Sequence, residues 1–327
     1  MSTSRRAFVK SAGLLSAGAF LAPSLVAAAA SAPKSYIGLQ LYTVRDAMQK
    51  DPAGTLAQVA QLGYTSVEGA TYTGSQNFYG MTPAAFAKQL KQAGLIMPSS
   101  HYRLGEEQYQ NQPVQGTMLY GWDKAVDDAA QAGVKYMVCA YLSEAERGNL
   151  DHYKLLADRL NKAGERCKKA GLQMCYHNHD FEFMPLEGQV PYDVLLRATD
   201  KDLVKMELDL YWATKAGKDP VALFQQHPGR FPLWHVKDMD KTPKRDFTEV
   251  GSGVIDFKRI FAQAGKSGMK YFFVEQDQTP GSPSTASRKA SPTSSTPWYK
   301  AGAACWFIPP ENQQLTSRTY PPETTLP

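Results

Sequence analysis

Between residues 33 and 280, eight short apolar runs alternate with longer segments that carry apolar residues at three- and four-residue intervals. Short runs of this kind predict buried strands, and the longer spacing predicts amphipathic helices. Helices are expected at residues 82–93, 151–170 and 256–264. Strands are expected at residues 36–42, 64–68, 95–100, 134–140, 172–178, 204–209, 232–237 and 271–275.

Glycines mark the boundaries between these elements. Gly63, Gly94, Gly133, Gly171 and Gly268 each stand where a helix ends shortly before a strand begins, a position that favours glycine because the backbone there turns left-handed. The strands recur at roughly the interval that a strand–helix unit needs. Eight such units predict an α/β fold, the (β/α)8 TIM barrel. A doubly wound sheet is the alternative, because periodicity alone does not show that a sheet closes.

The first 32 residues have the features of an export signal. The motif Ser-Arg-Arg-Ala-Phe-Val-Lys at residues 4–10 precedes a weakly apolar stretch rich in Ala and Gly, and small residues follow up to Ala32. We therefore expect a twin-arginine signal peptide at residues 1–32, a periplasmic protein and no stable membrane insertion after cleavage. The alternatives are a membrane anchor, for which the stretch is too weakly apolar, and an amphipathic helix, for which it lacks a polar face.

The composition changes again after residue 280. Of the last 47 residues, 22 are Ser, Thr or Pro, which leaves too few large apolar side chains to offset the entropy lost on ordering. We predict a disordered tail at residues 281–327 in place of the eighth helix of a barrel that spans residues 33–280. A choice of permitted codons for residues 282–296 can encode an amphipathic helix in a shifted frame, so we hypothesise a frameshift, in evolution or in sequencing, that resequencing the gene would test.

The charge distribution excludes one class of partner. The chain has a net charge of +5, of which residues 1–32 contribute +3 and residues 281–327 contribute +2. The barrel segment is therefore neutral. A neutral domain has no electrostatic surface for nucleic acid, so we expect a small-molecule partner and no nucleic acid.

Alternation along the strands indicates which polar side chains face the barrel axis. In residues 204–209, the apolar positions 204, 206 and 208 should face the helices, which turns Glu207 and Asp209 inward. The same alternation turns His177 and His179 inward at residues 172–178 and places His235 and Lys237 on one face of residues 232–237. His179 becomes a candidate for substrate binding.

Four successive strands, the fifth to the eighth, end in a side chain that can bind a metal: His177, Asp209, His235 and Glu275. Enzymes with this fold form their sites where the strands end, at the C-terminal mouth of the barrel. A mixed imidazole and carboxylate set suits one divalent metal ion, of which Mn, Zn, Fe and Co are the candidates. The alternative is that these residues form separate hydrogen bonds and hold no metal.

Weaker signals indicate further site residues. His101 ends the third strand and is a candidate at the mouth, although a lone histidine is as often structural. Glu68 and Gln40, in the second and first strand regions, are candidates for substrate binding, as is Ser252 in a Gly-Ser-Gly turn. Glu182 is a candidate to orient a ligand histidine.

Together these motifs resemble the sugar phosphate isomerase/epimerase family of xylose isomerase-like TIM barrels. That family includes inosose dehydratases, ketose 3-epimerases, hydroxypyruvate isomerases and relatives of endonuclease IV. The resemblance covers residues 35–280. The segments that carry it are Ile-Gly-Leu-Gln-Leu-Tyr-Thr at 37–43, Ser-Ser-His at 99–101, Tyr-His-Asn-His at 176–179, Leu-Asp at 208–209, His-Val-Lys-Asp at 235–238, Val-Gly-Ser-Gly at 250–253 and Val-Glu at 274–275.

The resemblance implies a divalent metal ion held by Glu, Asp, His and Glu from strands five to eight. The last three ligands map onto Asp209, His235 and Glu275. At the first position, relatives read Leu-Glu-Asn-His where this chain reads Tyr-His-Asn-His. His177 thus replaces a carboxylate that also acts as an acid and base in the epimerases, which argues against a symmetrical epimerisation by two carboxylates.

The resemblance and the candidate site together predict a metal-dependent sugar isomerase or epimerase. A proton would be removed next to a sugar carbonyl, and the metal would stabilise the enediolate as a Lewis acid. Glu275 could act as ligand and base, with Lys237 or His101 moving the second proton. Export favours an unphosphorylated sugar or glycoside, because phosphorylated metabolites are kept inside the cell.

Three other functions are compatible with this sequence. A keto-glycoside lyase or dehydratase could use the same site through the same enediolate. A non-catalytic periplasmic barrel that binds sugars would need the pocket without the chemistry. A phosphodiesterase like endonuclease IV would need more metal ligands and a more basic face than the neutral barrel segment offers.

Overall fold

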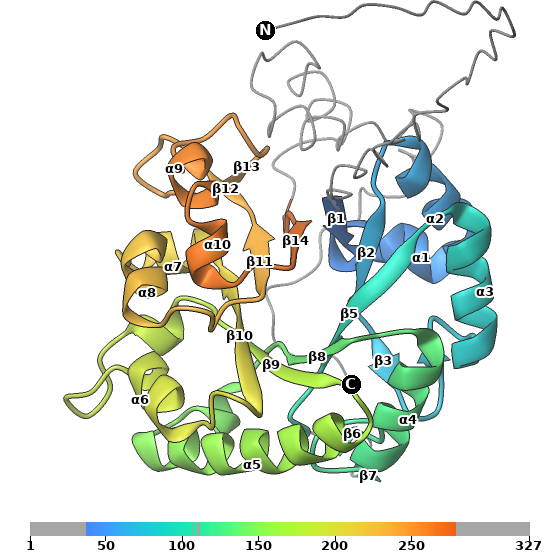
Figure 1. Cartoon of the computed structure of the whole chain (residues 1–327), viewed down its shortest axis with the longest axis horizontal. Helices are drawn as coiled ribbons and strands as arrows, with labels where there is room; N and C mark the ends of the chain where they lie inside the picture. Colours follow the sequence, from blue (N-terminus) through green and yellow to red (C-terminus); the bar gives the residue numbers. More distant parts are fainter. Residues whose placement is uncertain (1–36, 107, 110–111, 279–327) are drawn as a thin grey trace, which may run out of the picture. The chain divides into compact units, whose positions relative to one another are not determined.

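The computed structural model describes residues 37–106, 108–109 and 112–278, so the predicted signal peptide and tail lie outside the described residues. Eight parallel strands close into a barrel in the order β1-β14-β11-β10-β9-β8-β5-β2, with helices around the outside (Figure 1). The predicted TIM barrel is confirmed, and the doubly wound sheet is excluded because the first strand pairs with the last.

All eight predicted strands are present, each within about two residues of its expected bounds. The barrel strands are β1 (Ile37–Gln40), β2 (Ser66–Gly69), β5 (Ile96–Tyr102), β8 (Tyr136–Cys139), β9 (Gln173–His177), β10 (Val204–Asp209), β11 (Leu233–Val236) and β14 (Tyr271–Val274). Three two-stranded ribbons were not predicted: β3 (Tyr72–Thr73) with β4 (Asn77–Phe78), β6 (Gln108–Tyr109) with β7 (Gln112–Pro113), and β12 (Asp238–Met239) with β13 (Phe247–Thr248).

The helices fill the segments between the strands. The α-helices are α1 (Arg45–Lys50), α2 (Pro52–Gln61), α3 (Pro83–Ala93), α4 (Trp122–Ala132), α5 (Leu150–Lys169), α6 (Pro191–Ala198), α7 (Leu210–Lys215), α8 (Pro220–Gln226), α9 (Phe257–Phe261) and α10 (Ala264–Ser267). Three short 3-10 helices, η1 (Leu41–Val44), η2 (Glu144–Glu146) and η3 (Phe181–Phe183), follow barrel strands at the mouth. Among the described helices, none combines the length and the apolar character needed to cross a membrane.

One predicted helix is wrong in its extent. The segment 256–264 forms α9 and α10 rather than one helix, because the backbone at Gln263 leaves the helical region with φ −102° and ψ 9°. The predicted helix ends are otherwise well placed. All five glycines that were expected to end helices have positive φ values, between 75° and 94°.

The barrel has apolar cores on both faces of its wall. Val204, Met206 and Leu208 of β10 belong to the large core beneath the helices, as the alternation predicted. Inside the barrel, Val138, Cys175, Leu233 and Phe273 form a separate buried layer, which we call the floor. Gly38 of β1 makes room for it, since a Cβ atom at that position would overlap the Phe273 ring.

Candidate active site at the barrel mouth

A polar layer lies directly above the floor. On three strands the floor residue is followed, two positions nearer the C-terminal mouth, by a polar one: Cys175 by His177, Leu233 by His235, and Phe273 by Glu275. Side chains two positions apart on a strand share a face, so these polar groups also point into the barrel. All three are at most 5% exposed.

The polar layer contains two groups of side chains that share His235. The outer cluster consists of Asp209, His235, Lys237, Glu275 and Asp277. The Lys237 Nζ lies 2.8 Å from Glu275 Oε2, 3.1 Å from Asp209 Oδ2 and 2.8 Å from Asp277 Oδ1. His235 Nδ1 lies 2.6 Å from the same Glu275 oxygen.

The backbone of β10 fixes the direction of Asp209. Its Oδ1 accepts a hydrogen bond of 2.8 Å from the backbone N–H of Trp212 and so caps the N-terminus of α7. Its own backbone N–H donates to the Asn178 side chain at the end of β9 over 3.1 Å. With one carboxylate oxygen used as a helix cap, the other is held toward Lys237 and His235.

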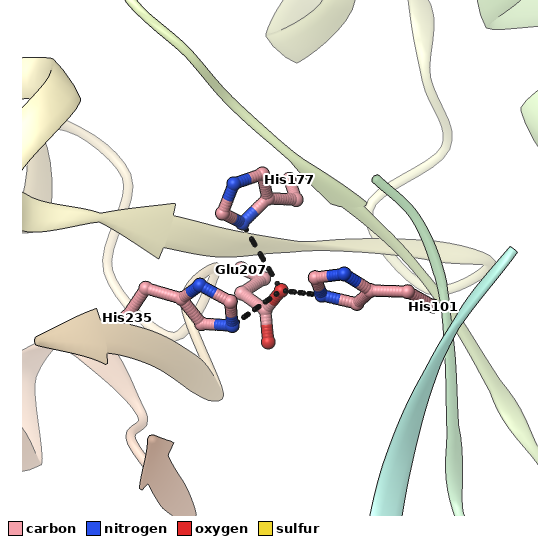
Figure 2. A group of neighbouring side chains, drawn as sticks. All are labelled: His101, His177, Glu207 and His235. Carbon is pink, nitrogen blue, oxygen red and sulfur yellow. Dashed lines mark hydrogen bonds and ion pairs between the residues drawn. The ribbon is translucent and has the colours of Figure 1, made fainter. Parts of the chain in front are cut away.

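The inner cluster consists of His101, His177, Glu207 and His235, from the barrel strands β5, β9, β10 and β11. Figure 2 shows three imidazole rings around one carboxylate. The Glu207 Oε2 atom lies 2.9 Å from His101 Nε2, 3.2 Å from His177 Nδ1 and 3.3 Å from His235 Nε2. Glu207 precedes Asp209 by two residues on β10, so the inner cluster lies one step deeper in the barrel.

Two predicted substrate-binding residues, Gln40 and Glu68, support the inner cluster from the side. Both are fully buried. Glu68 Oε2 lies 2.5 Å from His235 Nε2 and accepts a hydrogen bond of 2.8 Å from the Gln40 amide. The other Glu68 oxygen accepts from the Ser99 hydroxyl. These contacts hold the His235 ring between the inner and outer clusters.

Electrostatics keep Lys237 and Glu275 of the outer cluster charged. Burial alone would lower the pKa of Lys237, but Asp209, Asp277 and Glu275 raise it well above its usual range. Burial would raise the pKa of Glu275, but Lys237 and His235 hold it far below its usual range. Glu275 is therefore ionised at neutral pH and Lys237 is protonated. Burial raises the pKa of Asp277 to about 7.

Two histidines of the inner cluster have pKa values that are shifted in opposite directions. Burial would lower the pKa of His101, but Glu68 and Glu207 raise it to about 9. Burial and the neighbouring His235 lower the pKa of His177 well below its usual range. Burial, with the nearby Glu68 charge, raises the pKa of Glu207 to about 7. His177 is thus neutral, with a ring nitrogen available to bind a metal or hold a proton.

The donor atoms fit a metal ion. Asp209, His235 and Glu275 form one group whose ligand atoms lie within 4.8 Å of one another. The fourth predicted ligand, His177, has its Nε2 3.9 Å from Asp209 Oδ2, so the structure brings all four together. Asp209 Oδ2 and His235 Nδ1 are both buried, with Lys237 and Glu275 as their close charged neighbours, so the outer cluster concentrates buried carboxylate and imidazole atoms of the kind that bind divalent metals.

An aromatic wall stands at the rim beside the outer cluster and consists of Tyr141, His179, Phe181 and Trp212. The His179 and Phe181 rings are stacked, with centroids 5.4 Å apart and planes 3° apart. Tyr141 meets His179 edge-on, and Trp212 lies 5.6 Å from His179 on another side. Lys237 Nζ is 5.9 Å from the Trp212 ring centroid, which connects the wall to the outer cluster.

Three other predicted residues lie away from the metal-binding atoms. His179 is in the aromatic wall, at the rim. Ser252 is exposed, and the backbone N–H groups of its neighbours Gly251 and Gly253 donate hydrogen bonds to the Asp238 carboxylate. These bonds fix the conformation of the turn. The role expected for Glu182 is corrected: its oxygens accept hydrogen bonds from the Tyr176 hydroxyl and the His179 backbone, and it orients the backbone rather than an imidazole.

Sequence reasoning missed two functional candidates. Glu207 was expected to face the axis but was not assigned to a ligand set, although it lies at the centre of the inner cluster. Asp277 was not considered because it follows the end of β14. The alternation Glu275-Gln276-Asp277 was the available signal, since it places Asp277 on the same side of the chain as Glu275.

Comparisons with known proteins agree with the barrel fold. The family model described as "Xylose isomerase-like TIM barrel" matches residues 56–299, past the predicted barrel boundary at residue 280. A sugar phosphate isomerase/epimerase from Parabacteroides distasonis, a solved structure, is 28% identical, with a TM-score of 0.65 over 87% of this chain and 96% of that chain.

Two further proteins are similar to this chain over a shorter segment or at a lower sequence identity. An inosose dehydratase from Clostridium beijerinckii is 29% identical over 149 residues, which are 40% of this chain and 49% of the dehydratase, so the match spans about half of that relative. The solved IolI protein with a binding zinc atom is 14% identical, with a TM-score of 0.58 over 83% of this chain and 94% of that chain, and shares the fold. Because the family model matches three quarters of its length, the chain belongs to the xylose isomerase-like TIM barrel family. Members of this family include sugar isomerases, epimerases and dehydratases.

Proposed function

We propose that this protein is a metal-dependent enzyme that removes a proton next to the carbonyl group of a sugar, as an isomerase or epimerase does. The observation that carries the proposal is the outer cluster, in which an ionised carboxylate and an ammonium group lie 2.8 Å apart beside buried metal-binding atoms. A base, an acid and a cation site are the three groups that enediolate chemistry needs.

Asp209, His235 and Glu275 would hold the divalent ion, with His177 beside them. Candidate ions are Mn, Zn, Fe and Co, all of which accept mixed imidazole and carboxylate ligands. When bound, the ion would supply Lewis-acid polarisation of the substrate carbonyl. The zinc in the structurally similar IolI protein supports the presence of a metal, and the donor set of this chain supports its place.

Glu275 is the base in this proposal, and Lys237 is the acid. Glu275 is ionised and so can accept a proton, although its contacts with Lys237 and His235 hold its basicity down. Substrate that displaces Lys237 from Glu275 would raise that basicity at the moment of reaction. Lys237 can then return a proton at the neighbouring position. His101 serves this step less well, because the His235 ring stands next to it on the inner side.

A dehydratase or lyase reaction is the second candidate, and the inosose dehydratase relatives favour it. Elimination starts from the same enediolate but needs an acid for the departing hydroxyl or alkoxide. Asp277, with a pKa of about 7, lies 2.8 Å from Lys237 at the outer edge of the cluster. A carboxyl group with a pKa near neutrality can both give and take a proton.

The aromatic wall would bind the sugar ring. Aromatic faces stack on the apolar faces of sugar rings, and the Trp212 Nε1 and His179 Nδ1 atoms are buried without a hydrogen-bond partner among the described residues. Both nitrogens could bond to sugar hydroxyl groups. A periplasmic location, which the twin-arginine motif supports, would favour an unphosphorylated sugar or glycoside. Replacing Arg5 and Arg6 together by Lys should leave the precursor in the cytoplasm, as fractionation would show.

Solvent deuterium exchange tests the proposal. The metal-loaded protein is incubated in D2O with a panel of keto-sugars and keto-glycosides, and deuterium next to the carbonyl is measured by mass spectrometry. We expect exchange with at least one substrate, loss of exchange in Glu275→Gln, and restoration by metal after chelation. The products then distinguish epimerisation, isomerisation and elimination. A folded, metal-loaded protein that exchanges no member of the panel would instead support a sugar-binding barrel without catalysis.

A further inference from the structure

The inner cluster offers a set of metal ligands distinct from the outer one. His101, His177, Glu207 and His235 each place one ligand atom within 4.8 Å of all the others. The ligand atoms of a tetrahedral ion with bonds of ~2.1 Å are ~3.4 Å apart, so small side-chain shifts would bring all four atoms into one coordination sphere. Figure 2 shows the four side chains converging from separate strands on a common point.

Hydrogen bonding explains only part of this convergence: Glu68 Oε2 lies 2.5 Å from His235 Nε2 and 3.2 Å from His101 Nε2, but it does not contact His177. Three ring nitrogens surround a single oxygen, Glu207 Oε2, at 2.9–3.3 Å. The other oxygen, Glu207 Oε1, is fully buried and has no hydrogen-bond partner among the described residues. A purely structural carboxylate would distribute its donors over both oxygens, because an unsatisfied buried carboxylate oxygen is costly.

His235 links the two clusters through its two ring nitrogens. Its Nε2 lies 3.3 Å from Glu207 and faces the inner cluster, and its Nδ1 lies 2.6 Å from Glu275 and faces the outer one. A neutral imidazole has one lone pair and therefore binds a metal through one nitrogen at a time. The two positions consequently compete for the same ring.

We propose that the inner cluster is a second metal position, that it takes ions favouring imidazole ligands, such as Zn²⁺ or Co²⁺, and that His235 allows only one of the two positions to be filled at a time. The inner set supplies three imidazoles and one carboxylate. The outer set is richer in carboxylates and suits Mn²⁺. Ligand type selects the ion in each case, so the metal supplied decides which position is occupied.

Titration of the metal-stripped full-length protein with Co²⁺ or Mn²⁺ tests this assignment. Co²⁺ is followed by its visible absorption and Mn²⁺ by its electron paramagnetic resonance signal. His101→Gln removes only an inner ligand, and Glu275→Gln removes only an outer one. His227→Gln is the matched control, because His227 belongs to neither cluster.

We expect one ion per wild-type chain with either metal. His101→Gln should weaken Co²⁺ binding by at least about tenfold and alter its absorption bands, while Mn²⁺ binding changes by less than about threefold. Glu275→Gln should show the opposite pattern, and His227→Gln should change neither. Glu207→Gln serves as a second inner variant if His101→Gln does not fold.

Two results would overturn the proposal. If Glu275→Gln weakens both ions alike and the inner variants weaken neither, the outer cluster is the only metal position. If wild-type chains bind two ions at once, His235 does not make the positions exclusive. Neither result depends on the exchange of deuterium into sugars, so the metal titration tests the inner position independently of the proposed function.

Discussion

The floor and the polar layer of the barrel interior are built by the same strands in opposite ways. On β9, β11 and β14, each inward apolar residue of the floor is followed two positions later by an inward His or Glu of the polar layer. The floor gains stability from burying apolar area. The polar layer buries charged groups, and removing them from water is costly. Only the attraction between groups of opposite charge offsets this cost. The difference separates residues that hold the barrel together from residues to which we assign the proposed chemistry.

The largest effect we expect is in the floor. Phe273→Ala should lower the free energy of unfolding by about 4 kcal/mol, because it leaves a cavity in a closed layer that cannot collapse. Urea unfolding followed by circular dichroism measures this. The molecules that stay folded should keep most of their deuterium exchange activity. If activity per folded molecule falls as far as in polar-layer variants, the separation between the two layers is wrong.

A substitution in the polar layer should have the reverse effect. Lys237→Gln should reduce the rate of deuterium exchange by at least about a hundredfold, or about 2.7 kcal/mol, because it removes the proposed acid. The rate is measured with whichever panel sugar the wild type exchanges, and Lys201→Gln, an exposed lysine paired with Asp202 away from the barrel mouth, is the control. Full activity in Lys237→Gln would remove this residue from the chemistry.

The polar layer should make stability depend on pH between about 6.5 and 9. The pKa of His101 is raised to about 9 from about 6.5 when unfolded, so its stabilisation is present below pH 6.5 and lost as the pH rises toward 9. We expect the metal-free protein to lose about 2 kcal/mol over this range. Urea unfolding at several pH values should show a smaller loss in His101→Gln. An equal loss in both proteins would contradict the charge assigned to this histidine.

The smallest effect is expected at the rim. Tyr141 is 40% exposed and contacts His179 edge-on. Tyr141→Ala should leave stability nearly unchanged and raise KM for a sugar substrate about fivefold, or about 1 kcal/mol, with kcat nearly unchanged. Steady-state kinetics separates the two constants. A fall in kcat with an unchanged KM would place this residue in the chemical step instead of in binding.

Much of the fold and part of the site follow from alternation along single strands. The pattern along β10 predicted that Glu207 and Asp209 face inward, and their contacts with His101, His235 and Lys237 inside the barrel confirm it. Alternation does not give depth, which depends on how neighbouring strands are staggered. His177 pairs with Glu207, while Asp209 pairs with His235, so His177 lies with the inner cluster as well as near Asp209. The division into two clusters therefore required the closed barrel.

The rim could not be predicted from strand patterns. Tyr141, Phe181 and Trp212 follow β8, β9 and β10 in loops or at helix starts, where no period fixes the direction of a side chain. Their meeting around His179 results from the backbone path, which Glu182 and the Asp209 cap of α7 hold in place. Asp277 belongs to the same class, because it lies beyond the last paired residue of β14.

Anomalous diffraction from crystals loaded with Mn²⁺, recorded at the manganese edge, tests the central claim most directly. The account predicts one peak per chain at the barrel mouth, within about 2.5 Å of ligand atoms of Asp209, His235 and Glu275. Fully loaded protein with no peak inside the barrel, or with manganese only at surface carboxylates, would contradict it.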